Sequence, residues 1–369
     1  MLLLRSRRST TTTSVVRLLY LGLVIWSCCC CDWWYLSTPS QYYGAHAFTL
    51  VTFDVDGTLI QGSGQAAEAS LHAQAFSHAV RIVLASSSSS SGNSNKNQKD
   101  IPPVAQALPR ELYHGSTDGL ILLRLAQATL DMDATESFPY LPQMMDCMYQ
   151  FMLSQSNDDA SSIGKYISPL PGVMEHLTEL ANRKDSVMCG LVTGNVEGIA
   201  RLKMKTVGIY DTGVLAEACE TQRIWDGTQD LAFLGGFGSD FCSGDIVDLD
   251  RNHLDRGEQI AIAVQRCQRQ LAKRHSGTNN NNDPTSLLKR VVHVGDAPAD
   301  VLAAKALSER KLQNQVDDEL CVGMVAVATG SYPADLLQEL AGSPIPGKWE
   351  PVVLEQGMGD PMFLKACGL

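Results

Sequence analysis

The segment FTLVTFDVDGTL, residues 48–59, decides the fold of this chain. Its first six residues, 48–53, form an apolar run typical of a strand. Asp54 and Asp56 follow at once, and because residues two apart in an extended chain point the same way, we expect their carboxylates to face one site. Gly57 then allows a turn, and a plain Asp-Gly turn is the alternative interpretation of these residues. A calcium-binding loop is excluded, because the third oxygen ligand and the closing Glu are missing.

The composition is that of an acidic globular protein. A chain of 369 residues with 44% hydrophobic residues is typical of two or three domains with a large buried core. Its net charge is -11, and because residues 1–47 carry four Arg and one Asp, the remainder has a net charge of -14. This acidity disfavours binding to nucleic acid and to anionic membranes. Seven cysteines are scattered after the Cys28–Cys31 run without a C-x-x-C pair, which argues against a zinc site or a disulfide framework and indicates buried free thiols.

Residues 1–47 are interpreted as a targeting segment. Three early arginines and a Ser/Thr run precede the apolar stretch 18–31, which has the length of a signal-peptide core and is shorter than the ~20 residues that span a bilayer. Ala45-His46-Ala47 fits a cleavage site, whereas Trp33, Trp34 and Tyr35 favour the alternative of a retained membrane anchor. The Ala-Phe junction at 47–48 also resembles the leaders of algal plastid proteins that enter through the secretory route. We therefore expect secretory-route entry, with the plastid as one destination.

Apolar runs of strand type alternate with helical patterns in the later part of the chain. This alternation predicts the α/β class, with a doubly wound, Rossmann-like parallel sheet. The interval from Asp56 to Pro169 breaks this alternation, and no convincing strand is expected between its helical stretches. The strands expected besides the first are residues 188–193, 291–295 and 324–328.

The long interval after the first strand is predicted to be an inserted all-helical cap, residues 62–168. It far exceeds the length that one crossover connection needs. The core domain then comprises residues 48–61 and 169–369, and the cap lies over the carboxyl edge of the sheet, where a doubly wound fold binds its ligand. Two polar tracts, the Ser-rich loop 86–98 and residues 276–283, are expected to be exposed insertions. Helical spacing of apolar residues is found in the stretches 71–84, 117–130 and 140–153.

Thr193-Gly194-Asn195 closes the second expected strand. A hydroxyl and free backbone N–H groups at a helix start form a site for an anion the size of phosphate. The same residues are also compatible with an ordinary helix cap. A helix is expected to begin near Val196.

Asp296 and Asp300 follow the third expected strand. Their spacing of four lets Asp300 reach over the first helical turn toward Asp296, although an acid at a helix start also simply complements the helix dipole. Together with Asp54 and Asp56, these carboxylates predict a hard oxygen site suited to Mg²⁺.

At this point the chain resembles the haloacid dehalogenase superfamily, in particular its phosphoglycolate-phosphatase-like members with a helical cap inserted after the first strand. The resemblance extends from Phe48 to about Leu340. The strongest matches are FDVDGTL at 53–59, GDxxxD at 295–300 and TGN at 193–195. Softer matches lie at 114–118, 169–173 and 235–240.

The resemblance implies a Mg²⁺-dependent phosphatase that hydrolyses a small phosphomonoester through an aspartyl phosphate. Asp54 would be the nucleophile. Asp56 would protonate the leaving alkoxide and then deprotonate the hydrolytic water. Thr193, with the N–H groups of Gly194 and Asn195, would hold the phosphoryl oxygens.

The resemblance also implies a metal-ligand set and a cation facing the phosphate. Mg²⁺ would be bound by the Asp54 carboxylate, the Asp56 backbone carbonyl and Asp296, with Asp300 binding directly or through water. The family commonly supplies the cation as a Lys before a Pro, and this chain has no Lys-Pro pair. The candidates for this cation are Arg256 first and Lys203 second.

A cap that closes over the site implies a small phosphorylated metabolite as substrate, with phosphoglycolate as the nearest family example. The alternatives are a sugar phosphomutase of the same superfamily and a binding or scaffold protein that keeps the fold without activity. Membrane contact is expected only if the N-terminal segment is retained as an anchor. The sequence gives no indication of the oligomeric state.

Overall fold

The computed structural model divides the chain into two units, residues 1–46 and 47–369, and all described residues belong to the second. The expected targeting segment, the Ser-rich loop and the polar tract 276–283 lie outside the described residues, apart from Ala47. In the described part of the chain, no helix is long and apolar enough to cross a membrane. The described residues are 47–62, 71–85, 100–157, 167–212, 234–275, 287–314 and 316–369.

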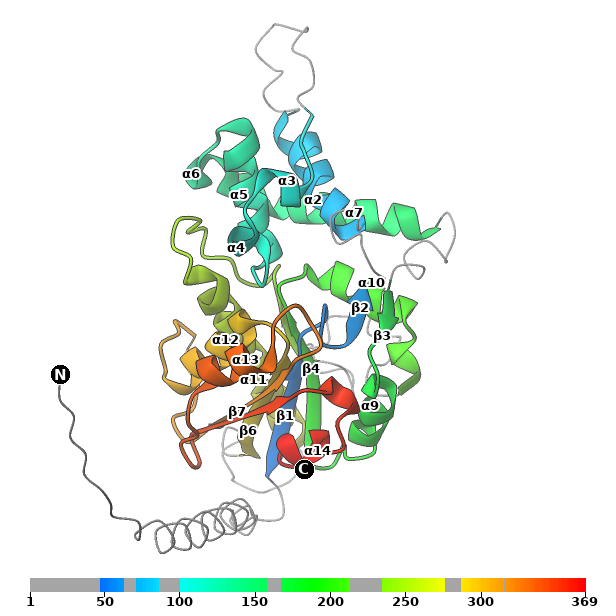
Figure 1. Ribbon diagram of the computed structural model, residues 1–369, viewed down its shortest axis with the longest axis vertical. Coiled ribbons are helices and arrows are strands. Elements are labelled where there is room, and N and C mark those ends of the chain that lie inside the picture. The colour runs from blue at the N-terminus through cyan, green and yellow to red at the C-terminus, as the bar shows by residue number, and fades with distance from the viewer. Residues whose placement is uncertain are drawn as a thin grey trace, which may run out of the picture. The chain divides into compact units, whose positions relative to one another are not determined.

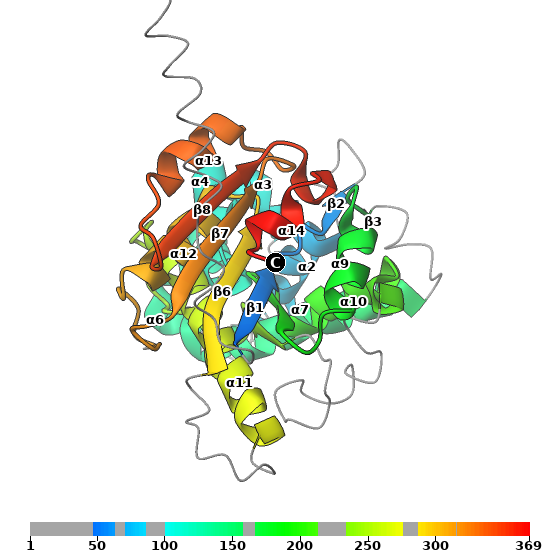
Figure 2. The same ribbon diagram turned by 90° about the horizontal axis from the view of Figure 1, so that it is seen from below.

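A six-stranded parallel sheet forms the centre of the second unit, in the order β5-β4-β1-β6-β7-β8 (Figures 1 and 2). The predicted α/β class with a doubly wound parallel sheet is confirmed. β1 lies between β4 and β6, so that Phe53 pairs with Leu191 on one side and with Val294 on the other. The strands are β1 (Phe48–Phe53), β4 (Val187–Thr193), β5 (Leu234–Phe237), β6 (Leu288–Gly295), β7 (Cys321–Val327) and β8 (Trp349–Leu354).

Helices cover both faces of this sheet (Figures 1 and 2). On one face lie α11 (Arg251–His275), α12 (Pro298–Ser308) and α13 (Ala334–Ala341). On the other lie α9 (Val173–Ala181), α10 (Glu197–Thr206) and the short α14 (Phe363–Ala366). Strands covered on both faces are expected to be apolar along their whole length. The strands of the sheet centre follow this rule, since Leu50, Val51 and Phe53 of β1 have no exposed surface.

A second hydrophobic cluster lies among the helices between β1 and β4. It includes Phe76, Leu122 and Met148. It is separate from the hydrophobic cluster formed by the sheet strands and the helices that cover them. The helices are α2 (Leu71–Val80), the π-helical turn η1 (Arg81–Ala85), α3 (Val104–Ala107), α4 (Arg110–Tyr113), α5 (Asp118–Leu130), α6 (Ala134–Ser137), the 3₁₀ turn η3 (Phe138–Tyr140) and α7 (Leu141–Asn157).

Sequence reasoning did not identify two short strands at the two ends of the 62–168 interval. β2 (Ile60–Gly62) and β3 (Ile167–Pro169) pair antiparallel where the chain leaves the sheet and returns to it. Each has three residues, which is too short for a periodic pattern of apolar residues to be seen. They form a two-stranded ribbon between the sheet and the helices α2 to α7 (Figure 1).

Candidate active site

The carboxyl ends of three neighbouring strands meet at one edge of the sheet. Asp54 directly follows β1, Thr193 ends β4, and Asp296 follows Gly295 at the end of β6. The sheet order reverses direction at β1, and such a switch point leaves a crevice at the strand ends. Asp54, Thr193 and Asp296 are all buried.

Three of the predicted carboxylates form one cluster. Ligand oxygens of Asp54, Asp296 and Asp300 all lie within 4.8 Å of one another. Burial raises the pKa of Asp54 to about 6, against the lowering effect of Arg256. Burial, together with the charges of Asp54 and Asp300, raises the pKa of Asp296 well above its ordinary value. The ionised forms of Asp54 and Asp296 are therefore disfavoured in this crowded, buried cluster.

Arg256, near the start of α11, is placed against this cluster. Its Nη1 donates to Asp54 Oδ1 at 2.8 Å and to Asp300 Oδ1 at 2.9 Å. The guanidinium is buried, with 4% of the side chain exposed. Burial disfavours ionised Asp300, but Arg256 and His293 more than offset this effect and hold the pKa of Asp300 below its ordinary value. The first candidate cation thus contacts the predicted nucleophile.

The cluster carries more negative than positive charge. Among the described residues, Arg256 is the arginine or lysine that hydrogen-bonds to these carboxylates. The imidazole of His293 also lies 3.4 Å from Asp300 Oδ1. Asp296 itself accepts from the hydroxyl of Thr58 at 3.2 Å. Buried carboxylates with a net charge of this sign fit a divalent cation with oxygen ligands.

Two glycines leave room for the Asp296 carboxylate. A Cβ at Gly57 would lie 2.3 Å from Asp296 Oδ2, and a Cβ at Gly330 would lie 1.7 Å from the same atom. The two turns are tied together, because Thr329 Oγ1 donates to the carbonyl of Gly57 at 2.6 Å. Backbone therefore surrounds this carboxylate closely on two sides, and any side chain at either position would displace it.

Asp56 and Lys203 form a separate pair beside the cluster. Lys203 Nζ lies 2.9 Å from Asp56 Oδ1 and 2.6 Å from Oδ2, and Asn195 Nδ2 donates to Oδ2 at 3.0 Å. The Asp56 side chain is 49% exposed, whereas that of Lys203 is 5% exposed. Burial raises the pKa of Asp56, but the ammonium of Lys203 and the hydrogen bonds from Lys203 and Asn195 lower it more, so that it lies below its ordinary value. The second candidate cation thus contacts the predicted acid-base group.

The predicted phosphate-binding turn lies under the helical segment. Thr193 Oγ1 accepts from the Asn195 backbone N at 3.3 Å and from its Nδ2 at 3.1 Å. The N–H of Asp118, the first residue of α5, donates to the Gly194 carbonyl at 2.8 Å. A Cβ at Gly194 would lie 2.6 Å from the carbonyl oxygen of Ser116, so glycine permits this close approach.

A second contact between the helical segment and the sheet domain is made by residues 114–115. His114 Nδ1 and the Tyr332 hydroxyl lie 3.0 Å apart. A Cβ at Gly115 would lie 3.2 Å from that of Ala299 on α12. The helical segment therefore lies against the strand ends on the side of β4 and on the side of β6.

Sequence reasoning assigned no role to several residues of the site. Thr58 lies in the quoted opening segment, but its bond to Asp296 depends on the turn at Gly57. Thr329 and Gly330 follow β7, so the rule used for the other strand ends could have identified them. His72 and Asp118 lie on separate helices of the 62–168 interval and carry no local signal of their contact.

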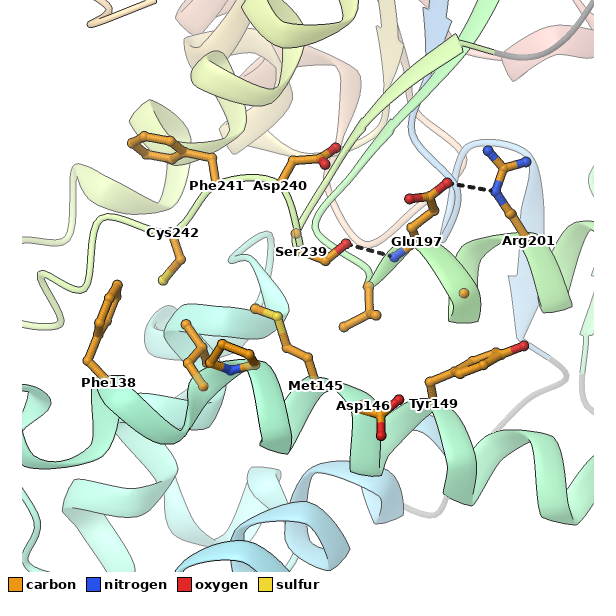
Figure 3. A pocket seen from close by; sticks show the side chains of 15 residues that line it. Phe138, Met145, Asp146, Tyr149, Glu197, Arg201, Ser239, Asp240, Phe241 and Cys242 are labelled. Carbon is orange, nitrogen blue, oxygen red and sulfur yellow. Dashed lines mark hydrogen bonds and ion pairs between the residues drawn. The ribbon is translucent and has the colours of Figure 1, made fainter. Parts of the chain in front are cut away.

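A cavity of about 590 Å³ lies beside the site, between the helical segment and the sheet domain (Figure 3). Phe138, Met145 and Tyr149 line one side. Glu197 and Ser239 line the other, where Ser239 Oγ accepts from the Glu197 N–H at 3.2 Å. The catalytic candidates are not among its lining residues.

No protein-family model matches the chain, and no curated protein does. Among solved structures, it is similar to CbbY from Rhodobacter sphaeroides in complex with phosphate, at 14% identity and a TM-score of 0.43, over 88% of this chain and 100% of that one. A hydrolase from Pseudomonas syringae has 14% identity and a TM-score of 0.41, over 87% and 99%. A predicted phosphoglycolate phosphatase from Haemophilus somnus has 14% identity and a TM-score of 0.37, over 87% and 100%.

Proposed function

We propose that this protein is a phosphatase of the haloacid dehalogenase type, which hydrolyses a small phosphomonoester through a phosphorylated Asp54. One observation carries the proposal: Asp54 lies at a sheet switch point with Arg256 on its carboxylate, Asp296 within the same cluster and Thr193 at the neighbouring strand end. This arrangement combines a buried nucleophile with charge-stabilising groups, which phosphoryl transfer requires.

In the first half of the proposed reaction, a carboxylate oxygen of Asp54 bonds to phosphorus while the bond from phosphorus to the leaving oxygen breaks. Asp56 gives a proton to that oxygen and the alcohol departs. Arg256 orients Asp54 through the bond to Oδ1 and balances negative charge that develops on the phosphoryl group. Thr193 and the N–H groups that follow it hold the phosphoryl oxygens.

In the second half, Asp56 takes a proton from water, which attacks phosphorus and releases inorganic phosphate and free Asp54. The ionised form of Asp56 is required for this step. The ammonium of Lys203, at 2.6 Å from Oδ2, stabilises that form. Lys203 thus supports the acid-base group, while Arg256 supports the nucleophile.

We propose Mg²⁺ as the cofactor, held by Asp54, Asp296 and Asp300, with the Asp56 carbonyl as a further ligand. Three buried carboxyl groups lie together here, and one arginine, Arg256, is paired with two of them, which supports this assignment. Bound there, Mg²⁺ would neutralise charge on the phosphoryl oxygens.

The substrate is proposed to be a small phosphorylated metabolite of the phosphoglycolate type. The buried state of Asp54 and Thr193, and the packing of residues 116–118 against Gly194, support a small substrate over a phosphorylated protein. The helical segment would then act as a cap that sets substrate choice.

The proposal is tested by measuring inorganic phosphate released from a panel of small phosphomonoesters by the purified protein. We expect turnover of at least one compound with Mg²⁺. Isomerisation of a sugar phosphate without net phosphate release would assign a mutase instead. A protein that binds but does not turn over any of them would be a binding protein.

Removal of divalent metal is expected to lower turnover by roughly 10²-fold or more, because the neutralisation of phosphoryl charge by a metal contributes several kcal/mol. The measurement compares phosphate release in EDTA with release after Mg²⁺ is restored. Recovery on adding Mg²⁺ is the control for irreversible damage. Full activity in EDTA would show that the carboxylate cluster does not act through a metal.

Gly330→Ala is expected to weaken Mg²⁺ binding about 10- to 100-fold, the usual range for changes beside metal ligands. The added Cβ would overlap Asp296 Oδ2 and turn that carboxylate out of the cluster. Titration calorimetry of the purified variant measures the affinity. Gly359→Ala is the matched control, because its Cβ would meet neighbours at 3.4 Å or more. Equal affinities in the two variants would contradict the assignment of Asp296 as a ligand.

A further inference from the structure

A chain of contacts leads from the helical segment to Asp56. His72 of α2 lies between Asp118 of α5 and Lys203 of α10. Its Nε2 is 3.2 Å from Asp118 Oδ2, and its Nδ1 is 3.4 Å from Lys203 Nζ. Lys203 in turn contacts Asp56. Four elements distant in sequence therefore meet along one line of polar groups.

The chemistry of Lys203 fixes the direction of these hydrogen bonds. An ammonium has three N–H donors and no acceptor. The partners of Lys203 are the Asp56 carboxylate, Asn195 Oδ1 at 2.6 Å and His72 Nδ1. His72 must then accept at Nδ1, so that its proton is on Nε2 and is donated to Asp118. With this arrangement the imidazole satisfies both neighbours.

Asp118 holds the same helix at a second point. Its Oδ2 also accepts the N–H of Val196 at 2.8 Å, immediately before α10. The helical segment thus contacts α10 at its start, through Asp118, and two turns later at Lys203, through His72. Lys203 is buried, and it contacts His72 of the helical segment as well as Asp56 and Asn195 of the sheet domain. Its position therefore depends on the helical segment as well as on α10.

We propose that His72, oriented by Asp118, is a positioning residue that fixes Lys203 on Asp56 and so makes proton transfer by Asp56 depend on the helical segment. This inference rests on the proposed phosphatase function. His72 acts through Lys203 and does not contact the reacting atoms. Neither His72 nor Asp118 was assigned a role in the reaction described above.

Leaving-group dependence tests this inference. Departure of an alkoxide needs a proton from Asp56, whereas p-nitrophenolate departs without one. His72→Phe retains a ring to stack on Phe76, whose centroid is 5.0 Å away, but loses both nitrogens. We expect kcat/KM for an alkyl phosphate to fall about 10- to 100-fold, part of the roughly 10²- to 10⁴-fold effect of general acid-base catalysis. The kcat/KM for p-nitrophenyl phosphate is expected to change by less than about threefold, because its leaving group needs no proton from Asp56.

Three further variants serve as controls. His78→Phe removes a second imidazole from α2, one whose ring packs at a tilt against Phe151, and is expected to leave kcat/KM for both substrates unchanged. His72→Gln keeps an amide able to reach one neighbour, and is expected to recover part of the loss. The double variant of His72→Phe and Lys203→Met is expected to have the same kcat/KM for the alkyl phosphate as Lys203→Met alone. Both changes interrupt the same line of contacts from His72 through Lys203 to Asp56.

The outcomes separate this inference from the proposed function. Equal losses of kcat/KM on both substrates would show that His72 is only structural. If His72→Phe is active and the ratio of its two kcat/KM values equals that of wild type, the inference is also overturned. If His72→Phe does not fold, the comparison is made with His72→Gln. A wild-type ratio of the two kcat/KM values in that variant would likewise overturn the inference. A wild-type protein without phosphatase activity would overturn the proposed function, and the inference with it.

Discussion

Asp54→Asn is expected to reduce phosphate release by about 10⁴-fold or more, in line with losses seen when a covalent nucleophile is removed. The amide has almost the shape of the carboxylate and its oxygen can still accept from Arg256, so packing is retained. What is lost is the atom that forms the bond to phosphorus. The measurement is steady-state phosphate release with the best substrate of the panel.

Stability distinguishes this result from misfolding. The substitution removes one of three carboxyl groups crowded near one guanidinium, so the metal-free variant is expected to unfold at no lower urea concentration than wild type. Asp131→Asn is the matched control, an exposed helix-capping residue in the left-handed conformation that Asn also adopts. Retained turnover in Asp54→Asn would refute the aspartyl-phosphate mechanism.

Arg256→Ala is expected to lower turnover by roughly 10³-fold, comparable to the loss of a charge-stabilising donor in phosphoryl or acyl transfer. It is also expected to lower the free energy of unfolding by about 3–5 kcal/mol, because it leaves buried carboxylates without their partner. Activity assays and urea unfolding measure the two effects separately.

Arg256→Lys separates charge from shape. An ammonium can donate to both Asp54 and Asp300, and Arg256 Nε has no hydrogen-bond partner among the described residues. We therefore expect Lys to recover much of the activity that Ala loses. Arg183→Ala, which removes a partly exposed arginine paired with Glu179, is the control and is expected to be near neutral. If Lys203→Met proved more damaging to the attack on phosphorus than Arg256→Ala, the cation assignment would be wrong.

Most of the sheet could be predicted because its central strands are apolar runs bounded by polar turns. β1, β4, β6 and β7 all have this form and were expected within a few residues of their ends. β5 and β8 were not. β5 is Leu-Gly-Gly-Phe, and β8 contains Pro351, which is tolerated there because β8 is an edge strand. Edge strands lack the continuous apolar pattern that buried central strands require.

The sequence alone determined where the proposed site lies, because polar residues that end neighbouring parallel strands must converge at one edge of the sheet. Asp54, Thr193 and Asp296 are expected to lie together on this ground alone. The sequence left open which cation faces the nucleophile. Only tertiary structure decided that Arg256 contacts Asp54 while Lys203 contacts Asp56, because the side chain that a helix directs into a site depends on how the whole helix packs. The same packing joins His72 to Lys203 across separate elements, a contact that no local pattern encodes.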